Sequence, residues 1–288
     1  MAKENCHWRV QENTGNQYLN RPIGVFDSGV GGLSVLKALR AELPGHDFIY
    51  IADSGHAPYG ERDDAHVIAR SQLITRWLLA QDIRALVIAC NTATAAAIHI
   101  LREEHPMLPI IGVEPALRPA VLLSTTGRIG VMATRGTLAS RKFQTLLSSQ
   151  AGGADFALQA CDGLADAIER SAASGDDAPV LAACTRHIDA MGRFGSQPGE
   201  IDTLVLGCTH YPFAQAQLRQ LVGPQVQIIS NGEAIARQTR RQLVTAQATA
   251  KTGQGSIRLL STGDASALGA AAHRWLGLPA HEAALVDL

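Results

Sequence analysis

The sequence predicts an α/β fold in which two similar lobes, each with a mainly parallel sheet flanked by helices, enclose an active site in the cleft between them. Three observations support this fold class. Short apolar runs alternate with helix-like segments along the chain. A strand followed by a polar turn occurs at residues 26–28 and recurs at residues 132–134. Two apolar runs of the same kind end at Cys90 and Cys208.

In the first part of the chain, short apolar runs indicate four buried strands of a parallel sheet, at residues 23–27, 48–52, 84–90 and 110–113. Helical patterns separate them. Gly31 and Gly32 open a helix with leucines at helical spacing, a long amphipathic helix is expected at residues 63–80, and an alanine-rich helix follows Cys90. Strands that alternate with helices in this way predict parallel pairing.

The pattern then restarts. Strands are expected at residues 129–133 and 156–160, in the run that ends at Cys208, and at residues 226–230 and 257–260. A less regular helical region spans residues 165–191, and a loop rich in Gly and Pro covers residues 192–200. We therefore expect a flexible N-terminal extension at residues 1–20, a first α/β lobe from residues 21–116 plus 232–288, and a second α/β lobe from residues 117–231.

Composition limits the class of protein. The 288 residues include 25 Lys and Arg against 26 Asp and Glu, a formal net charge of −1, which argues against a nucleic-acid partner. No run approaches the ~18 apolar residues of a membrane helix, and polar residues 1–20 lack the apolar core of a signal peptide. The five cysteines are scattered and form no C-x-x-C pair. We expect a cytoplasmic protein with reduced thiols and no membrane contact.

Cys90 and Cys208 carry the chemical prediction. Each follows a predicted buried strand, and open α/β sheets place their active sites at the carboxyl ends of strands. A single buried cysteine is commonly structural, but two in matching settings indicate a mirrored reaction. One thiol would remove a proton from one face of a carbon and the other would deliver one to the opposite face, as in a cofactor-independent racemase or epimerase. His210 adds a base that can activate Cys208.

Other chemistries have weaker support. The spacing of Cys208 and His210 suits a metal, but the remaining histidines do not form the paired spacings of a zinc site, so no metal is expected. No cofactor is expected either, because none of the four lysines lies in a turn typical of a Schiff-base lysine. The glycine-rich turn at residues 24–32 lacks the dinucleotide and phosphate-loop patterns. It is predicted to present Asp27 and Ser28 to the cleft.

Six segments together resemble the glutamate racemases of the aspartate/glutamate racemase superfamily: residues 25–32, 52–54, 58–60, 89–94, 112–115 and 206–212. The resemblance runs from residue 21 to the last helix. It implies cofactor-independent interconversion of L-glutamate and D-glutamate by a two-thiol proton transfer at the α-carbon. It further implies that the D-glutamate supplies peptidoglycan synthesis, and thereby cell-wall biogenesis and cell shape.

The resemblance also implies roles for matching residues. Cys90 would take the proton from D-glutamate and Cys208 from L-glutamate, with Asp27 and His210 assisting, one on each side. The residues implied in substrate binding are Asp27, Ser28, Pro58, Tyr59, Gly60, Asn91, Thr92, Thr134, Thr137, Thr209 and His210. Glu169 falls where the family has a glutamate, but residues 161–164 depart from the expected pattern, so the role of Glu169 stays open.

Two alternatives and several partners remain at this point. Relatives that act on aspartate tend to carry an acidic residue where this chain has His210, so glutamate is favoured over aspartate or a similar acid. A cleft between two lobes also suits a solute-binding module without enzymatic activity. The resemblance implies a homodimer. Some members of the family respond to a cell-wall precursor or bind DNA gyrase, and both would be additional contacts here.

Overall fold

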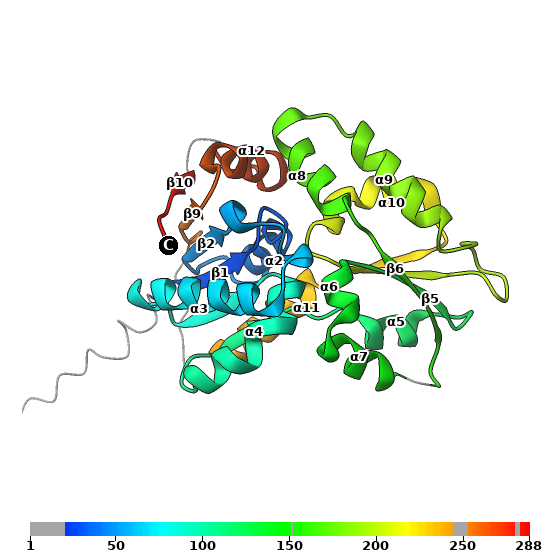
Figure 1. Ribbon diagram of the computed structural model, residues 1–288, viewed down its shortest axis with the longest axis horizontal. Helices are drawn as coiled ribbons and strands as arrows, with labels where there is room; N and C mark the ends of the chain where they lie inside the picture. Colours follow the sequence, from blue (N-terminus) through cyan, green and yellow to red (C-terminus); the bar gives the residue numbers. More distant parts are fainter. Residues whose placement is uncertain (1–20, 151, 245–252, 280–282) are drawn as a thin grey trace, which may run out of the picture.

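The computed structural model describes residues 21–150, 152–244, 253–279 and 283–288. Within them the chain forms two sheets that lie beside one another, each with helices packed against it (Figure 1). Every strand pairing in these residues is parallel. The predicted α/β fold class is therefore confirmed. The predicted extension at residues 1–20 lies outside the described residues.

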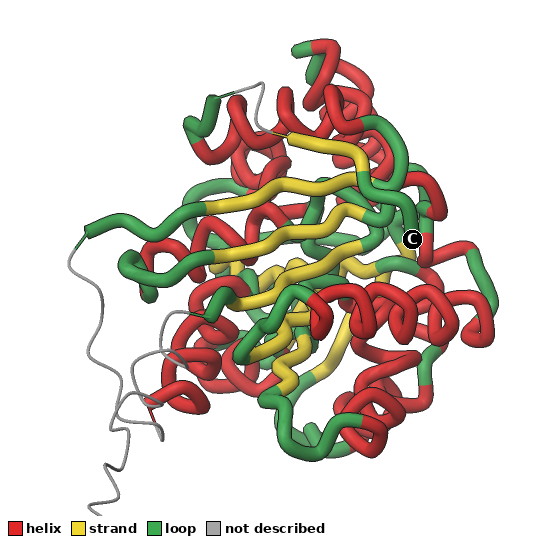
Figure 2. Tube along the Cα trace, turned by 90° about the vertical axis from the view of Figure 1, so that its left-hand side faces the viewer, coloured by secondary structure: helices red, strands yellow, loops and turns green. Residues whose placement is uncertain are grey.

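The larger sheet has six strands in the order β10-β9-β2-β1-β3-β4, and Figure 2 shows strands side by side with helices around them. Its strands are β1 (Ile23–Asp27), β2 (Phe48–Ala52), β3 (Ala85–Ile88), β4 (Ile110–Gly112), β9 (Ile257–Ser261) and β10 (Ala283–Leu285). The helices connected to them are α2 (Leu33–Glu42), α3 (Asp64–Ala80), α4 (Asn91–Glu104), α11 (Gly232–Val244) and α12 (Ala265–Leu276), with short 3-10 turns η1 (Ser54–His56) and η2 (Tyr59–Glu61).

The smaller sheet has four strands in the order β6-β5-β7-β8. They are β5 (Arg128–Ala133), β6 (Asp155–Ala160), β7 (Thr203–Gly207) and β8 (Gln227–Ile229). Its helices are α5 (Leu117–Leu123), α6 (Arg135–Ala139), α7 (Arg141–Ser148), α8 (Leu164–Ser174), α9 (Ala178–Asp189) and α10 (Gln215–Val222), with the 3-10 turn η3 (Tyr211–Ala214). In the part of the chain that the structure describes, no helix is long and apolar enough to cross a membrane.

The central strands β1, β5 and β7 are buried on both faces, which explains why they are continuous apolar runs. In β1, Val25 packs into one core and Phe26 into the core on the opposite face. In β5, Val131 and Met132 divide in the same way between two cores of the smaller sheet. Successive side chains of a strand point to opposite faces, so a strand without polar residues needs helices on both sides.

Each sheet has one point where the strand order reverses, and the predicted site residues lie at these two points. From β1 the chain pairs with β2 on one side and with β3 on the other, so Asp27 and Cys90 lie near each other at strand ends. In the smaller sheet, β5 and β7 flank the equivalent point, and Thr134 and Cys208 follow them. Open α/β sheets bind ligands at such points.

The structure differs from the predicted elements in a few places. β3 ends at Ile88, so Cys90 is not a strand residue but the N-cap of α4, where its sulfur accepts a hydrogen bond from the Ala93 N–H. The helical region at residues 165–191 is two helices, because Gly175 ends α8 in the left-handed conformation with φ of 74°. The structure adds α5 and β10, which the apolar pattern did not predict.

A buried ion pair holds the loop over the carboxyl end of the larger sheet. Asp53, just after β2, accepts hydrogen bonds from Arg70 Nε (3.0 Å) and Nη2 (2.8 Å). It also accepts from the Tyr59 hydroxyl (2.5 Å) and from Thr262 Oγ1 (2.8 Å). Burial opposes ionisation, but the hydrogen bonds from Arg70 and Tyr59 hold the pKa of Asp53 below its ordinary value. The network fixes the position of Tyr59.

Replacing Arg70 with leucine should destabilise the fold by about 3–5 kcal/mol, because the carboxylate of Asp53 would stay buried without its cation. Urea unfolding followed by circular dichroism measures the loss. Because the pKa of Asp53 is lowered in the folded protein, the loss should be full above the ordinary pKa of an aspartate and should shrink as the pH falls. Arg76→Leu, on the exposed side of α3, is the control. Equal losses for the two variants would contradict this account.

Candidate active site

A cavity of about 490 Å³ lies where the carboxyl ends of the two sheets face each other. All but one of the residues that the sequence pointed to line it: Asp27, Ser28, Pro58, Tyr59, Gly60, Cys90, Asn91, Thr92, Thr134, Cys208, Thr209 and His210. The exception is Thr137, which is buried behind Thr134 and accepts a hydrogen bond of 2.9 Å from its hydroxyl. The predicted residues therefore converge on one space, although they come from distant parts of the chain.

Cys90 lies on the side of the cavity formed by the larger sheet. Its sulfur is 3.5 Å from the Ala93 N–H at the start of α4 and 3.8 Å from the Ser28 hydroxyl. Burial raises the pKa of Cys90 well above the ordinary value of a thiol, and the nearby Asp27 carboxylate raises it further. The setting of Cys90 therefore favours the thiol form.

Asp27 joins the two lobes. Its Oδ1 accepts hydrogen bonds from the backbone N–H of Ser28 (2.6 Å) and from the Ser28 hydroxyl (3.2 Å). Its Oδ2 accepts one of 2.9 Å from Thr209 Oγ1, on the opposite lobe. Complete burial raises the pKa of Asp27, although the charge of His210 acts in the opposite direction. The protonated form of this carboxyl group is thus more favoured than in an exposed aspartate.

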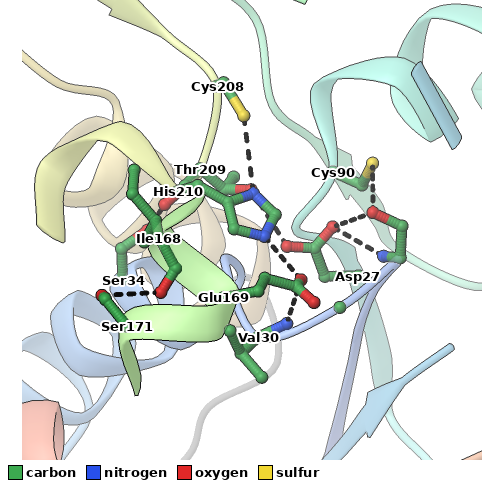
Figure 3. Close-up of polar contacts among 12 residues, drawn as sticks. Asp27, Val30, Ser34, Cys90, Ile168, Glu169, Ser171, Cys208, Thr209 and His210 are labelled. Atoms are coloured by element: carbon green, nitrogen blue, oxygen red, sulfur yellow. Dashed lines mark hydrogen bonds and ion pairs between the residues drawn. The ribbon is translucent and has the colours of Figure 1, made fainter. Parts of the chain in front are cut away.

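Cys208 has a different partner. Its sulfur is 3.5 Å from Nδ1 of His210, and Nε2 of the same ring is 2.7 Å from Glu169 Oε1 (Figure 3). Burial disfavours a charged imidazole, but the hydrogen bonds to Cys208 and Glu169 raise the pKa of His210 well above its ordinary value. Burial likewise disfavours a charged Glu169, but the hydrogen bond with His210 lowers the pKa of Glu169 below its ordinary value. The arrangement is a thiol–imidazole–carboxylate chain.

Glu169 is a site residue whose role the sequence left open. Its Oε1 also accepts a hydrogen bond of 3.1 Å from the backbone N–H of Val30, in the other lobe. The glycines of the turn at residues 24–32 allow Glu169 and His210 to lie this close to its backbone. A side chain at Gly29 would overlap the Glu169 carboxylate, and one at Gly31 would overlap the ring of His210. The glycine-rich turn therefore serves close packing of protein groups, not the binding of a dinucleotide.

Asn91 is the clearest ligand-binding group in the cavity. It is 5% exposed, and neither polar atom of its amide has a hydrogen-bond partner among the described residues. Buried polar groups are nearly always satisfied, so such an amide indicates a ligand. Beside it, Thr92 Oγ1 lies 3.3 Å from Thr134 Oγ1 across the cleft. Tyr59 differs, because its hydroxyl is bound to Asp53 and only its ring faces the cavity.

The structure also lines the cavity with residues that the sequence analysis did not assign. Besides Glu169, they are Ser54, Ala57, Glu61, Arg135, Cys161, Asp162, Gly163, Ala165 and Asp166. Arg135 pairs with Asp162 at 2.5 Å at the exposed edge of the cavity. In the described ranges, no three His, Cys, Asp or Glu side chains are grouped as metal ligands. The cavity wall thus combines neutral hydroxyl, amide and thiol groups with charged side chains, which include Glu61, Arg135 and Asp166.

Comparison with known proteins agrees with this geometry. A family model described as Asp/Glu/Hydantoin racemase matches residues 25–239. The chain belongs to this family. The glutamate racemase of Ralstonia nicotianae is 46% identical over 258 residues, which are 89% of this chain and 90% of that relative. The resemblance inferred from the six sequence segments is confirmed.

Solved structures of racemases in this family share the fold. Glutamate racemase isoform RacE1 from Bacillus anthracis superposes with a TM-score of 0.82 at 33% identity, covering 93% of this chain and 98% of that one. Escherichia coli glutamate racemase, solved in complex with L-glutamate and the activator UDP-MurNAc-Ala, gives a TM-score of 0.74 at 30% identity, covering 88% and 95%. The racemase fold therefore extends over nearly the whole chain.

Glu169→Gln should lower the pKa of His210 by at least about one pH unit, because the imidazolium would lose its carboxylate partner. Cys208 and Asp27 also face this ring, and both are unchanged in the variant. An NMR titration of protein labelled at histidine measures the pKa, with the signal assigned by its loss in His210→Asn. Glu61→Gln changes another glutamate of the cavity wall and should have no effect. A His210 pKa that is the same in wild type and Glu169→Gln would refute the pairing.

Proposed function

We propose that the protein is a glutamate racemase that interconverts L-glutamate and D-glutamate without a cofactor, by proton transfer between two thiols. One observation carries the proposal. Cys90 and Cys208 lie on opposite sides of a single cavity, and each has its own buried acid–base partner. A planar carbanion held between two such groups can lose a proton on one face and gain one on the other.

Glutamate is the proposed substrate because of the relatives. The Ralstonia relative is named a glutamate racemase, and the E. coli neighbour was solved with L-glutamate. The cavity suits a small amino acid, since sites of about 300–1,000 Å³ hold small ligands. Aspartate is the competing substrate, and a panel of both enantiomers of both acids distinguishes them.

In the L-to-D direction, Cys208 acts first. Its thiolate, beside the His210 imidazolium, takes the α-hydrogen of L-glutamate as a proton and becomes a thiol. The electron pair stays on the α-carbon, and the thiol of Cys90 then donates its proton to the opposite face. D-glutamate leaves, and Cys90 remains as the thiolate, which is the form that starts the reverse reaction. Asp27 and solvent return the protons between turnovers.

The α-hydrogen of an amino acid is a far weaker acid than a thiol, so the cavity has to stabilise the carbanion. Asn91 is placed to do this, because its buried amide lacks protein partners. Ser28, Thr92 and Thr209 add hydroxyl donors along the wall. Such fixed dipoles act strongly where water is excluded and need no reorganisation during the reaction. Neutral donors serve a substrate that carries both negative and positive charges.

The biological role follows from the proposed activity. D-glutamate made in the cytoplasm would supply peptidoglycan synthesis, and hence cell-wall biogenesis and cell shape. A homodimer and a contact with DNA gyrase stay predictions. Gyrase binding would be separate from catalysis, so a gyrase pull-down should succeed equally with a variant that lacks both catalytic cysteines.

Cys90→Ser and Cys208→Ser should each reduce racemisation by at least about 10²–10⁴-fold in both directions, because each direction needs one base and one acid. The decay of the optical signal of pure L-glutamate and of pure D-glutamate measures the loss, in metal-stripped samples without cofactor. Cys184→Ser, a buried cysteine outside the cavity, is the control. Near-normal turnover by either variant would overturn the two-thiol scheme. An inactive wild type that is folded and reduced would overturn the activity itself.

We also propose activation by a cell-wall precursor, since the E. coli neighbour was solved with the activator UDP-MurNAc-Ala. If residues 1–20 take part in this response, UDP-MurNAc-Ala should raise kcat/KM of the full chain and have no effect on a variant that lacks these residues. The basal activity of the two proteins should be equal. An identical response to the precursor, or none in either protein, would remove residues 1–20 from any regulatory role.

A further inference from the structure

The last helix, α12, lies in sequence between β9 and β10 of the larger sheet, but it also packs against α8 of the other lobe (Figure 1). It is preceded by β9 of the larger sheet, which anchors its start. Its far end contacts two segments that carry site residues. α8 carries Glu169, and the turn that begins at His210 leads into η3. α12 therefore contacts both segments that carry the imidazole–carboxylate pair: α8, which carries Glu169, and η3, which follows His210.

Arg274 makes the contact with α8. Its Nη1 donates a hydrogen bond to the backbone carbonyl of Ser171, two residues beyond Glu169. Its Nη2 is bound by both carboxylate oxygens of Asp177, at 2.9 and 2.8 Å. The guanidinium thus holds the last turn of α8 and the start of α9 together. A planar, forked cation gives such a contact a fixed direction as well as energy.

Trp275 makes the second contact. Its ring stacks on Phe213, with centroids 3.7 Å apart and planes 8° from parallel. Phe213 is three residues after His210, and its N–H donates to the His210 carbonyl at 3.0 Å. Both rings pack against a core of the larger sheet and against a core of the smaller sheet. The stacked pair is therefore a junction between the lobes, directly behind the turn that carries His210.

We propose that Arg274 and Trp275 are positioning residues for the Glu169–His210 pair. This inference rests on the proposed function, because it assigns them an effect on proton transfer at Cys208. Arg274 holds α8 at the height where Glu169 reaches His210, and Trp275 holds the turn that presents the ring. Neither side chain lines the cavity, so neither touches the substrate.

The geometry distinguishes this role from simple stabilisation. The carboxylate of Glu169 is held by the Val30 N–H and by His210. Its backbone is held by the position of α8. Loss of the contact between Arg274 and Ser171 would let α8 shift while the protein stays folded. Displacement of a catalytic group by about 1 Å costs up to about 100-fold in rate. A stabilising contact alone would change the melting temperature and leave the rate of the folded protein unchanged.

The test is a double-mutant cycle measured well below the melting temperature of every variant. Arg274→Ala should lower kcat about 10–100-fold for both enantiomers, with KM changed much less. In a Glu169→Gln background the same change should lower kcat less than about twofold, since effects that pass through one group do not add. Arg274→Lys, which keeps the charge but not the planar fork, should recover only part of the rate. Trp275→Leu should lower kcat in the same way.

Arg237→Ala is the matched control, because Arg237 pairs with Glu233 in another exposed ion pair, on α11. It should leave kcat unchanged. Wild-type kcat in the folded Arg274→Ala protein, or an equal loss in the Glu169→Gln background, would overturn the inference while the racemase activity stands. An inactive wild type would instead overturn the proposed function. Because the enantiomers are equal in free energy, kcat/KM must stay equal for both, which checks the assay.

Discussion

The structure depends on one hydrogen bond between lobes, from the hydroxyl of Thr209 to the carboxylate of Asp27. Asp27 ends a strand of the larger sheet and Thr209 follows a strand of the smaller one. The bond is buried, so its loss would leave Oδ2 of the buried Asp27 without this donor, while Oδ1 would keep its hydrogen bonds from Ser28. It brings the carboxyl ends of both sheets to one cavity and makes Cys90 and Cys208 face the same space.

Cys90 and Cys208 follow similar strands but lie in different electrostatic environments. Cys90 has a carboxylate beside it, and Cys208 has an imidazole whose pKa is raised by its hydrogen bonds to Cys208 and Glu169. The first setting favours the thiol form of Cys90, and the second places a polar hydrogen-bonding ring 3.5 Å from the sulfur of Cys208. A reaction between mirror images does not require a mirror-symmetric enzyme. It requires one acid and one base on opposite faces of the reacting carbon, and the two can lie in different environments.

Most of the sheet and most of the cavity wall could be predicted from the sequence, because apolar runs mark buried strands and the polar residues after them mark the site. Glu169 could not be assigned, since its role depends on a contact with His210, 41 positions away, that local patterns do not report. Tyr59 was expected to take part in substrate binding, and the sequence did not predict that its hydroxyl donates to Asp53. Short elements such as β10 lacked a signal for the same reason: pairing with β9 stabilises them, not their own sequence.

The acid–base machinery around Cys208 is assembled from both lobes. Glu169 comes from α8 of one lobe and accepts from the Val30 N–H of the other, and the hydroxyl of Thr209 reaches Asp27 in the same way. Opening the cleft would break both contacts at once. It would return Asp27 to water, where its pKa falls, and leave the imidazolium with a less fixed carboxylate. Both contacts therefore require the lobes to be together, and a closed cleft would also exclude the water that would quench a carbanion.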